Sequence, residues 1–213
     1  MAGLGSKRMR IQARPPIRSG LTRVTCVASR LLSRVCAGHA WLCLGGNLDG
    51  CWGRPVAAMK RAIAAIEEQG LEIIAQSDVF ETPPVGTVRQ PKFANMVVAV
   101  KGSVSPAQLL RMVKRIERAA GRRSGLRWGP RPLDIDLLDY AGRQINVGDT
   151  KREAGRLVLP HPEMHRRGFV LVPLAHVAPQ WRHPVLGLSA RSLIARRPIL
   201  ARGICVAIDP EGS

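Results

Sequence analysis

Two aspartates separated by one residue stand in the segment Leu133-Asp134-Ile135-Asp136-Leu137. Apolar and acidic residues alternate there, so on a strand both carboxylates would project from one face while the apolar side chains face a core. Carboxylates about 7 Å apart suit a hard cation, because Mg²⁺ is usually held by one or two carboxylates together with phosphate oxygens and water. A pair of this kind is more often an ordinary solvent-facing strand, so the pair alone leaves both interpretations open.

Arginines precede the aspartates at four positions, which are Arg122, Arg123, Arg127 and Arg131. Guanidinium groups bind phosphate oxygens in pairs, so carboxylates for a metal beside guanidiniums for phosphate indicate phosphoryl-type transfer. Such chemistry depends on in-line positioning and charge stabilisation more than on a protein nucleophile. The sequence contains no GxxxxGK[ST] motif, so a P-loop enzyme is not indicated.

Two histidines lie four residues apart in His161-Pro162-Glu163-Met164-His165. The glutamate is misplaced for either zinc-binding helix motif, HExxH or HxxEH, and the proline argues against one uninterrupted helix. We therefore expect no zinc site. A histidine that faces a nucleotide is the better functional interpretation of His161, with a packed or surface histidine as the alternative.

The elements that must position these residues follow from the apolar pattern. We expect strands over 41–44, 71–80, 93–100 and 133–140, and helices over 56–66 and 105–116. Ser105, Pro106 and Gln108 form a capping box with proline at the first helical position, and Gly70 stands where the earlier helix would end. The glycine- and arginine-rich stretch 121–132 predicts a mobile loop. Short connections between these elements favour an α+β sandwich, with helices covering one face of a largely antiparallel sheet.

Composition favours one domain plus a tail. The 213 residues include 33 Lys+Arg and 15 Asp+Glu, a formal net charge of +18 that attracts anionic partners. Residues 1–39 hold eight Lys/Arg and no acidic residue. There we expect a disordered basic leader or a start codon placed too early, rather than an organelle transit peptide. We expect the domain over 40–185 and a C-terminal segment of uncertain order over 186–213.

The remaining residue counts bear on compartment and partners. Five cysteines without a CxxC pair indicate reduced thiols, and so a cytoplasmic protein. No apolar run reaches the roughly 18 residues of a membrane-spanning helix. We expect no specific nucleic-acid partner, because only three Phe, four Trp and one Tyr could stack on bases. A basic nucleic-acid-binding module stays open as the alternative from another class, and a catalytically inactive relative as a third interpretation.

Five motifs occur in a fixed order along the chain. They are Gly45-Gly46-Asn47-Leu48; Phe80-Glu81-Thr82-Pro83-Pro84-Val85-Gly86; Gln90-Pro91 with Phe93 and Asn95; Arg127-Trp128-Gly129-Pro130-Arg131 leading into the two aspartates; and Pro160-His161-Pro162 with Arg167-Gly168-Phe169. In this order they resemble the 6-hydroxymethyl-7,8-dihydropterin pyrophosphokinase family. The resemblance covers about residues 41–185.

The resemblance implies a ferredoxin-like α+β fold and transfer of the β,γ-pyrophosphoryl group of ATP to the pterin hydroxymethyl oxygen, with release of AMP, in tetrahydrofolate biosynthesis. It implies two Mg²⁺ ions held by Asp134 and Asp136, and a triphosphate clamped by Arg122 and Arg131, these four being the catalytic residues. The implied pterin-binding residues are Thr82, Pro83, Pro84, Val85, Phe93, Asn95 and Phe169, of which the two phenylalanines would stack on the ring. The implied ATP-binding residues are Glu117, Arg122, Trp128, Arg131, Leu137, Arg156, His161 and Arg167. We expect a monomer whose partners are these small-molecule substrates.

The chain departs from the family pattern at a few positions. Ser124 stands where many relatives carry a second loop arginine, and Phe93 stands where some have tyrosine. Loss of the loop arginine weakens one of the implied clamps. Because four other arginines lie nearby, we expect slower loop closure at worst.

Overall fold

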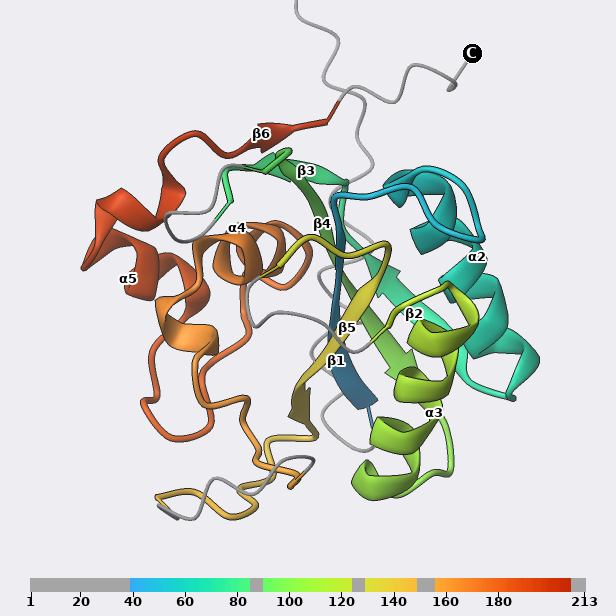
Figure 1. Ribbon diagram of the computed structural model, residues 1–213. Coiled ribbons are helices and arrows are strands. Elements are labelled where there is room, and N and C mark those ends of the chain that lie inside the picture. Colours follow the sequence, from blue (N-terminus) through green and yellow to red (C-terminus); the bar gives the residue numbers. More distant parts are fainter. Residues whose placement is uncertain (1–38, 85–89, 124–128, 149–155, 208–213) are drawn as a thin grey trace, which may run out of the picture. The chain divides into compact units, whose positions relative to one another are not determined.

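The computed structural model describes residues 39–84, 90–123, 129–148 and 156–207. Its strands are β1 (His39–Gly46), β2 (Glu72–Gln76), β3 (Phe80–Thr82), β4 (Phe93–Lys101), β5 (Asp134–Tyr140) and β6 (Cys205–Val206). Its helices are α2 (Pro55–Glu68), α3 (Pro106–Ala119), α4 (Gly168–Val177) and α5 (Ala190–Ala195), with short 3-10 helices η1 (Met164–Arg166) and η2 (Pro198–Ala201). The strands form one sheet of order β5-β1-β4-β3-β6, in which β2 also pairs with β4, and each pairing is antiparallel (Figure 1).

Helices cover both faces of this sheet, with α2 and α3 on one side and α4 and α5 on the other (Figure 1). Strand β1 shows why two layers are needed: Leu42 and Leu44 are buried under α2 and α3, whereas Trp41 and Cys43 are buried under α4. A strand that is apolar on both sides must be covered on both sides. The antiparallel α+β sandwich is confirmed, but the expectation that helices cover one face was wrong. Helix α4 is apolar around its whole circumference, so it shows no amphipathic period to predict it.

The predicted helix ends are confirmed. The Ser105 hydroxyl accepts a hydrogen bond from the Gln108 backbone N–H at 3.3 Å, and the Gln108 side chain accepts one from the Ser105 backbone N–H at 2.7 Å. This capping box starts α3, with Pro106 in the first turn. Helix α2 ends just before Gly70, whose φ of +81° favours glycine at that position.

The predicted strand over 71–80 is two short strands, β2 and β3. Between them, the Ser77 backbone N–H donates to the Val97 carbonyl at 2.9 Å, and the Val97 N–H donates to the Ser77 hydroxyl at 3.0 Å. The hydroxyl thus takes the place of a backbone acceptor, and the ladder is interrupted there. The register of β2 also shifts between Ile73 and Ala75.

The described part of the C-terminal segment packs on the same domain. Ala190 and Leu193 of α5 are buried in the core under α4, and β6 pairs with β3. The boundary expected at residue 185 therefore marks no change in packing. The basic leader, apart from His39, lies outside the described residues. In the parts of the chain that are described, no helix combines the length and apolar character needed to cross a bilayer.

His183 makes the stability of this packing dependent on pH. Its side chain is buried, and its Nδ1 accepts hydrogen bonds from the backbone N–H groups of Val185 and Leu186, both at 3.2 Å. Burial, with a smaller contribution from His165, lowers the pKa of His183 to about 4. The imidazole of the unfolded chain titrates near 6.5. As the pH falls from about 6.5 toward 4, the unfolded chain therefore takes up a proton that the folded protein does not, and the free energy of unfolding decreases.

We predict that the free energy of unfolding falls by about 1–2 kcal/mol between about pH 7 and about pH 5. The variant His183→Asn keeps an acceptor at the Nδ1 position but does not titrate, so its fall should be smaller. Urea denaturation at both pH values measures the difference. An equal fall in both proteins would assign the pH dependence to other groups.

Candidate active site

The two aspartates lie on β5, with their side chains on the sheet face toward α4. In the pairing with β1, Asp136 is opposite Cys43 and Asp134 is opposite Gly45. Directly opposed residues point to the same face, and the Cys43 thiol is buried under α4. Burial raises the pKa of Cys43, and the charges of Asp136 and Asp134 both raise it further. The two carboxylates therefore lie on the same face of the sheet, as the alternation in the sequence indicates.

A row of opposed residues crosses the sheet from Asp134 through Gly45 to Asn95 and Phe80. A Cβ atom at Gly45 would lie only 2.5 Å from Oδ1 of Asn95, so glycine is required for the amide to lie there. Asn95 is buried, and its Nδ2 donates to Oγ1 of Thr82 at 2.8 Å. The same face therefore carries a carboxylate and, across one glycine, an oriented amide.

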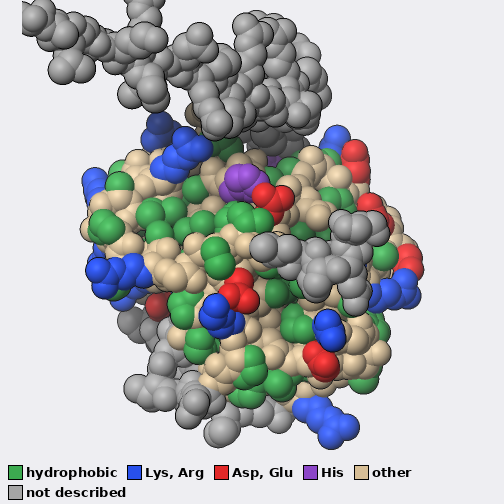
Figure 2. All heavy atoms as spheres, turned by 90° about the horizontal axis from the view of Figure 1, so that it is seen from above, with side chains coloured by type: hydrophobic (Ala, Val, Ile, Leu, Met, Phe, Trp, Pro, Cys, Tyr) green, Lys and Arg blue, Asp and Glu red, His purple; other side chains and the backbone are tan. Residues whose placement is uncertain are grey.

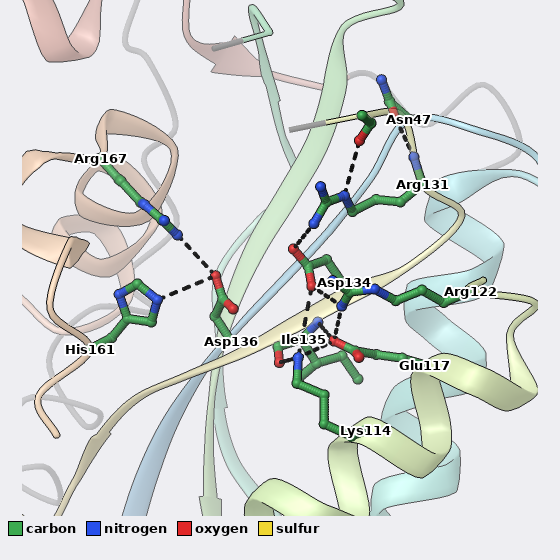
Figure 3. Close-up of polar contacts among 11 residues, drawn as sticks. Asn47, Lys114, Glu117, Arg122, Arg131, Asp134, Ile135, Asp136, His161 and Arg167 are labelled. Carbon is green, nitrogen blue, oxygen red and sulfur yellow. Dashed lines mark hydrogen bonds and ion pairs between the residues drawn. The ribbon is translucent and has the colours of Figure 1, made fainter. Parts of the chain in front are cut away.

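Three cations surround Asp134 (Figure 3). Arg131 NH1 donates to Oδ2 at 2.8 Å, Arg122 NH1 contacts Oδ1, and Lys114 Nζ lies 3.9 Å from the same Oδ1. Burial opposes ionisation of Asp134, but these cations outweigh it and hold the pKa of the carboxyl below its ordinary value. Asp134 is therefore ionised at neutral pH.

Asp136 has a separate set of partners (Figure 3). Arg167 NH1 donates to its Oδ2 at 3.1 Å, and His161 Nε2 lies 3.9 Å from the same oxygen. Arg167 is the residue that precedes α4, and its guanidinium lies 5.7 Å from the ring centre of Phe169. Burial lowers the pKa of His161, so at neutral pH the positive partner of Asp136 is Arg167.

Glu117 fixes the backbone between the aspartates from the opposite side. Its buried carboxylate accepts hydrogen bonds from the Ile135 backbone N–H at 2.6 Å and from Lys114 Nζ at 2.7 Å, and Arg122 NH1 lies 2.6 Å away. Burial raises the pKa of Glu117 to about 7, against the opposing influence of Lys114 and the Ile135 N–H. These contacts are with protein groups, so they favour a role in positioning β5 and Arg122 over direct contact with a nucleotide.

Asn47 connects two loops, a role that the sequence did not reveal. Its Oδ1 accepts from the Arg131 backbone N–H at 2.9 Å, and its Nδ2 donates to Gln90 Oε1 and to the Pro91 carbonyl, both at 3.1 Å. A Cβ atom at the preceding Gly46 would lie 2.3 Å from the Pro132 carbonyl oxygen. The Gly-Gly-Asn motif was a signal for this loop junction. Lys114, three residues before Glu117 on one helix, was the other missed residue.

The other candidates are distributed around this centre. Thr82, Pro83 and Pro84 end or follow β3, Phe93 begins β4, and Phe169 lies in the first turn of α4. Leu137 is buried in the core under α2 and α3, which leaves only its backbone for ligand contact, and Arg156 donates to Asn146 Oδ1 at 3.2 Å. Val85 and Trp128 lie outside the described residues, as do Ser124 and Arg127. His161 also lines a cavity of about 220 Å³ with residues that include Val158 and His165.

We predict that Glu117→Ala lowers the free energy of unfolding by about 2–3 kcal/mol, because the buried Ile135 N–H and the cations around it lose their acceptor. Glu117→Gln keeps an acceptor oxygen for Ile135 and should lose less. Guanidinium denaturation of both variants at neutral pH measures the difference. If the alanine variant were as stable as the parent, desolvation of the carboxylate would cancel the contacts that it makes.

Comparisons with known proteins identify relatives of this chain. The family model of 7,8-dihydro-6-hydroxymethylpterin-pyrophosphokinase (HPPK) matches residues 41–179. A 2-amino-4-hydroxy-6-hydroxymethyldihydropteridine pyrophosphokinase of Methylorubrum extorquens is 40% identical over 142 residues, which cover 66% of this chain and 83% of that protein. The Bacillus subtilis protein of the same name is 35% identical over 142 residues, covering 66% and 78%.

Among solved structures, wild-type Plasmodium falciparum HPPK-DHPS has a TM-score of 0.55 at 18% identity. The match covers 74% of this chain and 44% of that one, so this chain spans less than half of the Plasmodium protein. At that identity the likeness concerns the fold. The family-model match and the relatives at 35% and 40% identity show that this chain belongs to the HPPK family.

Proposed function

We propose that this protein transfers the β,γ-pyrophosphoryl group of ATP to 6-hydroxymethyl-7,8-dihydropterin in folate biosynthesis, with release of AMP. The observation that carries the proposal is the row across the sheet, where the carboxylate of Asp134 and the amide of Asn95 flank Gly45 on the same face. An acidic pair for the phosphate end and an oriented amide for a heterocycle are thus in adjacent positions. Family membership supplies the reaction, and this arrangement supports it.

The phosphate end of the site is formed by arginines that already point at the acidic pair. Arg122 and Arg131 contact Asp134, and Arg167 contacts Asp136. A guanidinium binds phosphate oxygens as well as carboxylate oxygens, so each of these groups can pass from a carboxylate to an entering triphosphate with little movement. The arginines then hold the triphosphate and compensate the charge that develops during transfer.

The acidic pair fits divalent cations. Both side chains are partly exposed, at 24%, and Asp134 is ionised at neutral pH. No group of three or more acidic, histidine or cysteine ligands occurs in the described ranges of the chain. Two carboxylates suit Mg²⁺, which takes its other ligands from phosphate and water. We propose that Asp134 and Asp136 hold two Mg²⁺ ions, which supply neutralisation of the phosphate charge when bound.

The pterin end follows from the orientation of Asn95. Because Nδ2 of Asn95 donates to Thr82, its Oδ1 is directed over Gly45 and can accept an N–H of the heterocycle. We propose that Phe93 and Phe169 stack on the ring, and that Pro83, Pro84 and Val85 form the adjoining wall. Orientation of the ring would bring its hydroxymethyl oxygen toward the acidic pair.

The remaining assignments are proposals on the same basis. His161, Trp128, Arg156 and the backbone of Leu137 would contact the nucleotide, whereas Glu117 would act by positioning Arg122 and β5. We also propose that the enzyme is a cytoplasmic monomer whose partners are its small-molecule substrates, with no specific nucleic-acid partner.

The reaction is tested by incubating the full chain with ATP, Mg²⁺ and the hydroxymethyl dihydropterin and separating the nucleotides by chromatography. We expect AMP and a pterin diphosphate in equal amounts, and no AMP without the pterin. Formation of ADP with a monophosphorylated pterin would refute pyrophosphoryl transfer. Binding to nucleic acid without any turnover of ATP would favour the alternative class of function.

The metal-binding assignment is tested by Asp134→Asn and Asp136→Asn. Each should lower kcat by about 100-fold or more, because the neutral amide cannot hold the cation that balances the phosphate charge. Asp139→Asn is the matched control: Asp139 lies on the same strand, but its carboxylate accepts from Trp181 Nε1 at 3.0 Å, away from the pair. Near-normal kcat in the first two variants at saturating Mg²⁺ would contradict the assignment.

A further inference from the structure

Two walls of the proposed pterin slot come from different parts of the chain. One wall follows β3 at Thr82 and Pro83, and the other is formed at the start of α4 by Phe169. The two segments are separated by more than eighty residues of sequence, so nothing local sets their spacing. The last described part of the chain, residues 198–207, contacts both of them; from here on, the C-terminal segment means these residues alone and excludes α5.

The first contact joins η2 to the start of α4. A Cβ atom at Gly168 would lie 1.6 Å from the Leu200 carbonyl oxygen and 3.2 Å from Cδ1 of Ile204. Only glycine allows this approach, which brings η2 against the residue between Arg167 and Phe169. The Leu200 side chain packs against the same core as Phe169.

The second contact joins β6 to β3. Cys205 is opposite Glu81 and Val206 is opposite Phe80, and the Ala207 N–H donates to the Val79 carbonyl at 2.8 Å. The position of a Cβ atom on Gly203 is 3.6 Å from Cγ of Pro83, which is ordinary van der Waals contact. The C-terminal segment therefore reaches the Pro83 wall directly.

The C-terminal segment contributes little to the core. No residue of η2 is buried, both residues of β6 are exposed, and the Ile199 side chain is 62% exposed. Figure 2 looks onto the side of the molecule where β3 and β6 lie in Figure 1; hydrophobic side chains cover much of this face, and many lysine and arginine side chains lie toward its rim. The contacts of the C-terminal segment therefore add little to the stability of the core.

We propose that the C-terminal segment positions the two walls of the pterin slot, with Leu200 and Gly203 as its positioning residues. The inference rests on the proposed function. If the two walls are already held at the separation that the ring needs, binding does not have to order them first. The affinity for a flat ring is then higher. The part of the segment from Gly203 onward touches the Pro83 wall and β3, so a change at Gly203 should affect pterin affinity and leave ATP affinity unchanged.

The test compares two full-length variants with the same backbone strain. Gly203 has φ +69° and Gly187 has φ +66°, so valine is unfavourable at both positions. At Gly203 the added methyl groups would press on Pro83, whereas no atom lies within 4 Å of a Cβ at Gly187. We expect Gly203→Val to raise the KM for the pterin by about tenfold, and Gly187→Val by less than about twofold. The KM for ATP should change by less than about twofold in both, and both melting temperatures should fall alike.

A chain that ends at Ala201, and so lacks β6 and Gly203, gives an independent measurement. Its affinity for the pterin, measured by calorimetry with a non-hydrolysable ATP analogue, should fall by a similar factor. Equal pterin KM values in the two valine variants, or an unchanged pterin affinity in a folded truncated chain, would overturn the inference. AMP formation by the parent enzyme is measured before any variant is compared. Absence of AMP there would contradict the proposed function itself rather than the role of the C-terminal segment.

Discussion

Asp134 and Asp136 carry like charges on one face of one strand, and the compensation of their repulsion is the constraint on which the site depends. At about 7 Å and an effective dielectric constant of about 20, this repulsion amounts to about 2 kcal/mol. The structure compensates it with a different arginine for each carboxylate, from the loop before β5 and from the start of α4. Those arginines come from opposite sides of the pair, so the fold must bring the start of α4, thirty-one residues from Asp136, against the segment that carries Arg131 and both aspartates. The same negative charge that makes the pair costly also attracts cations.

The glycines at the end of β1 explain how this arrangement fits in a small domain. Gly45 leaves room for the Asn95 amide, and Gly46 allows close approach of the Pro132 carbonyl. A side chain at either position would separate the acidic pair from the amide or displace the loop that carries Arg131. Asn47 then connects that loop to Gln90 and Pro91. The Gly-Gly-Asn motif thus joins the strands and loops that carry the site residues.

Buried polar contacts add to the apolar packing that holds β5 in place. The Glu117 carboxylate lies beneath the strand and satisfies the Ile135 N–H between the two aspartates. It thereby couples helix α3, Arg122 and the acidic pair into one network. Such a network is rigid when each member is satisfied, and it is destabilised when one acceptor is removed. The geometry of the acidic pair therefore depends on a residue that need not touch either substrate.

Much of the local structure could be predicted from the chain, because it depends on neighbouring residues. The alternation around Ile135 determined which face the aspartates share, and Ser105 with Gln108 determined where α3 begins. The ordered motifs determined the family, which implied most of the site residues. The sequence pattern did not predict the break between β2 and β3, because the Ser77 hydroxyl there replaces a backbone acceptor. It also did not predict α4, because that helix is apolar on every side and has no amphipathic period.

Tertiary structure alone decided which arginine pairs with which aspartate, that Glu117 is turned inward, and that η2 and β6 lie against the proposed pterin walls. Apart from the local Arg131–Asp134 pair, these relations join separate elements, and they arise when those elements pack on the two faces of the sheet. A charge in the sequence carries no record of its partner or of its burial. Those are properties of the packed chain, because the distance to the partner and the exclusion of water exist only after folding.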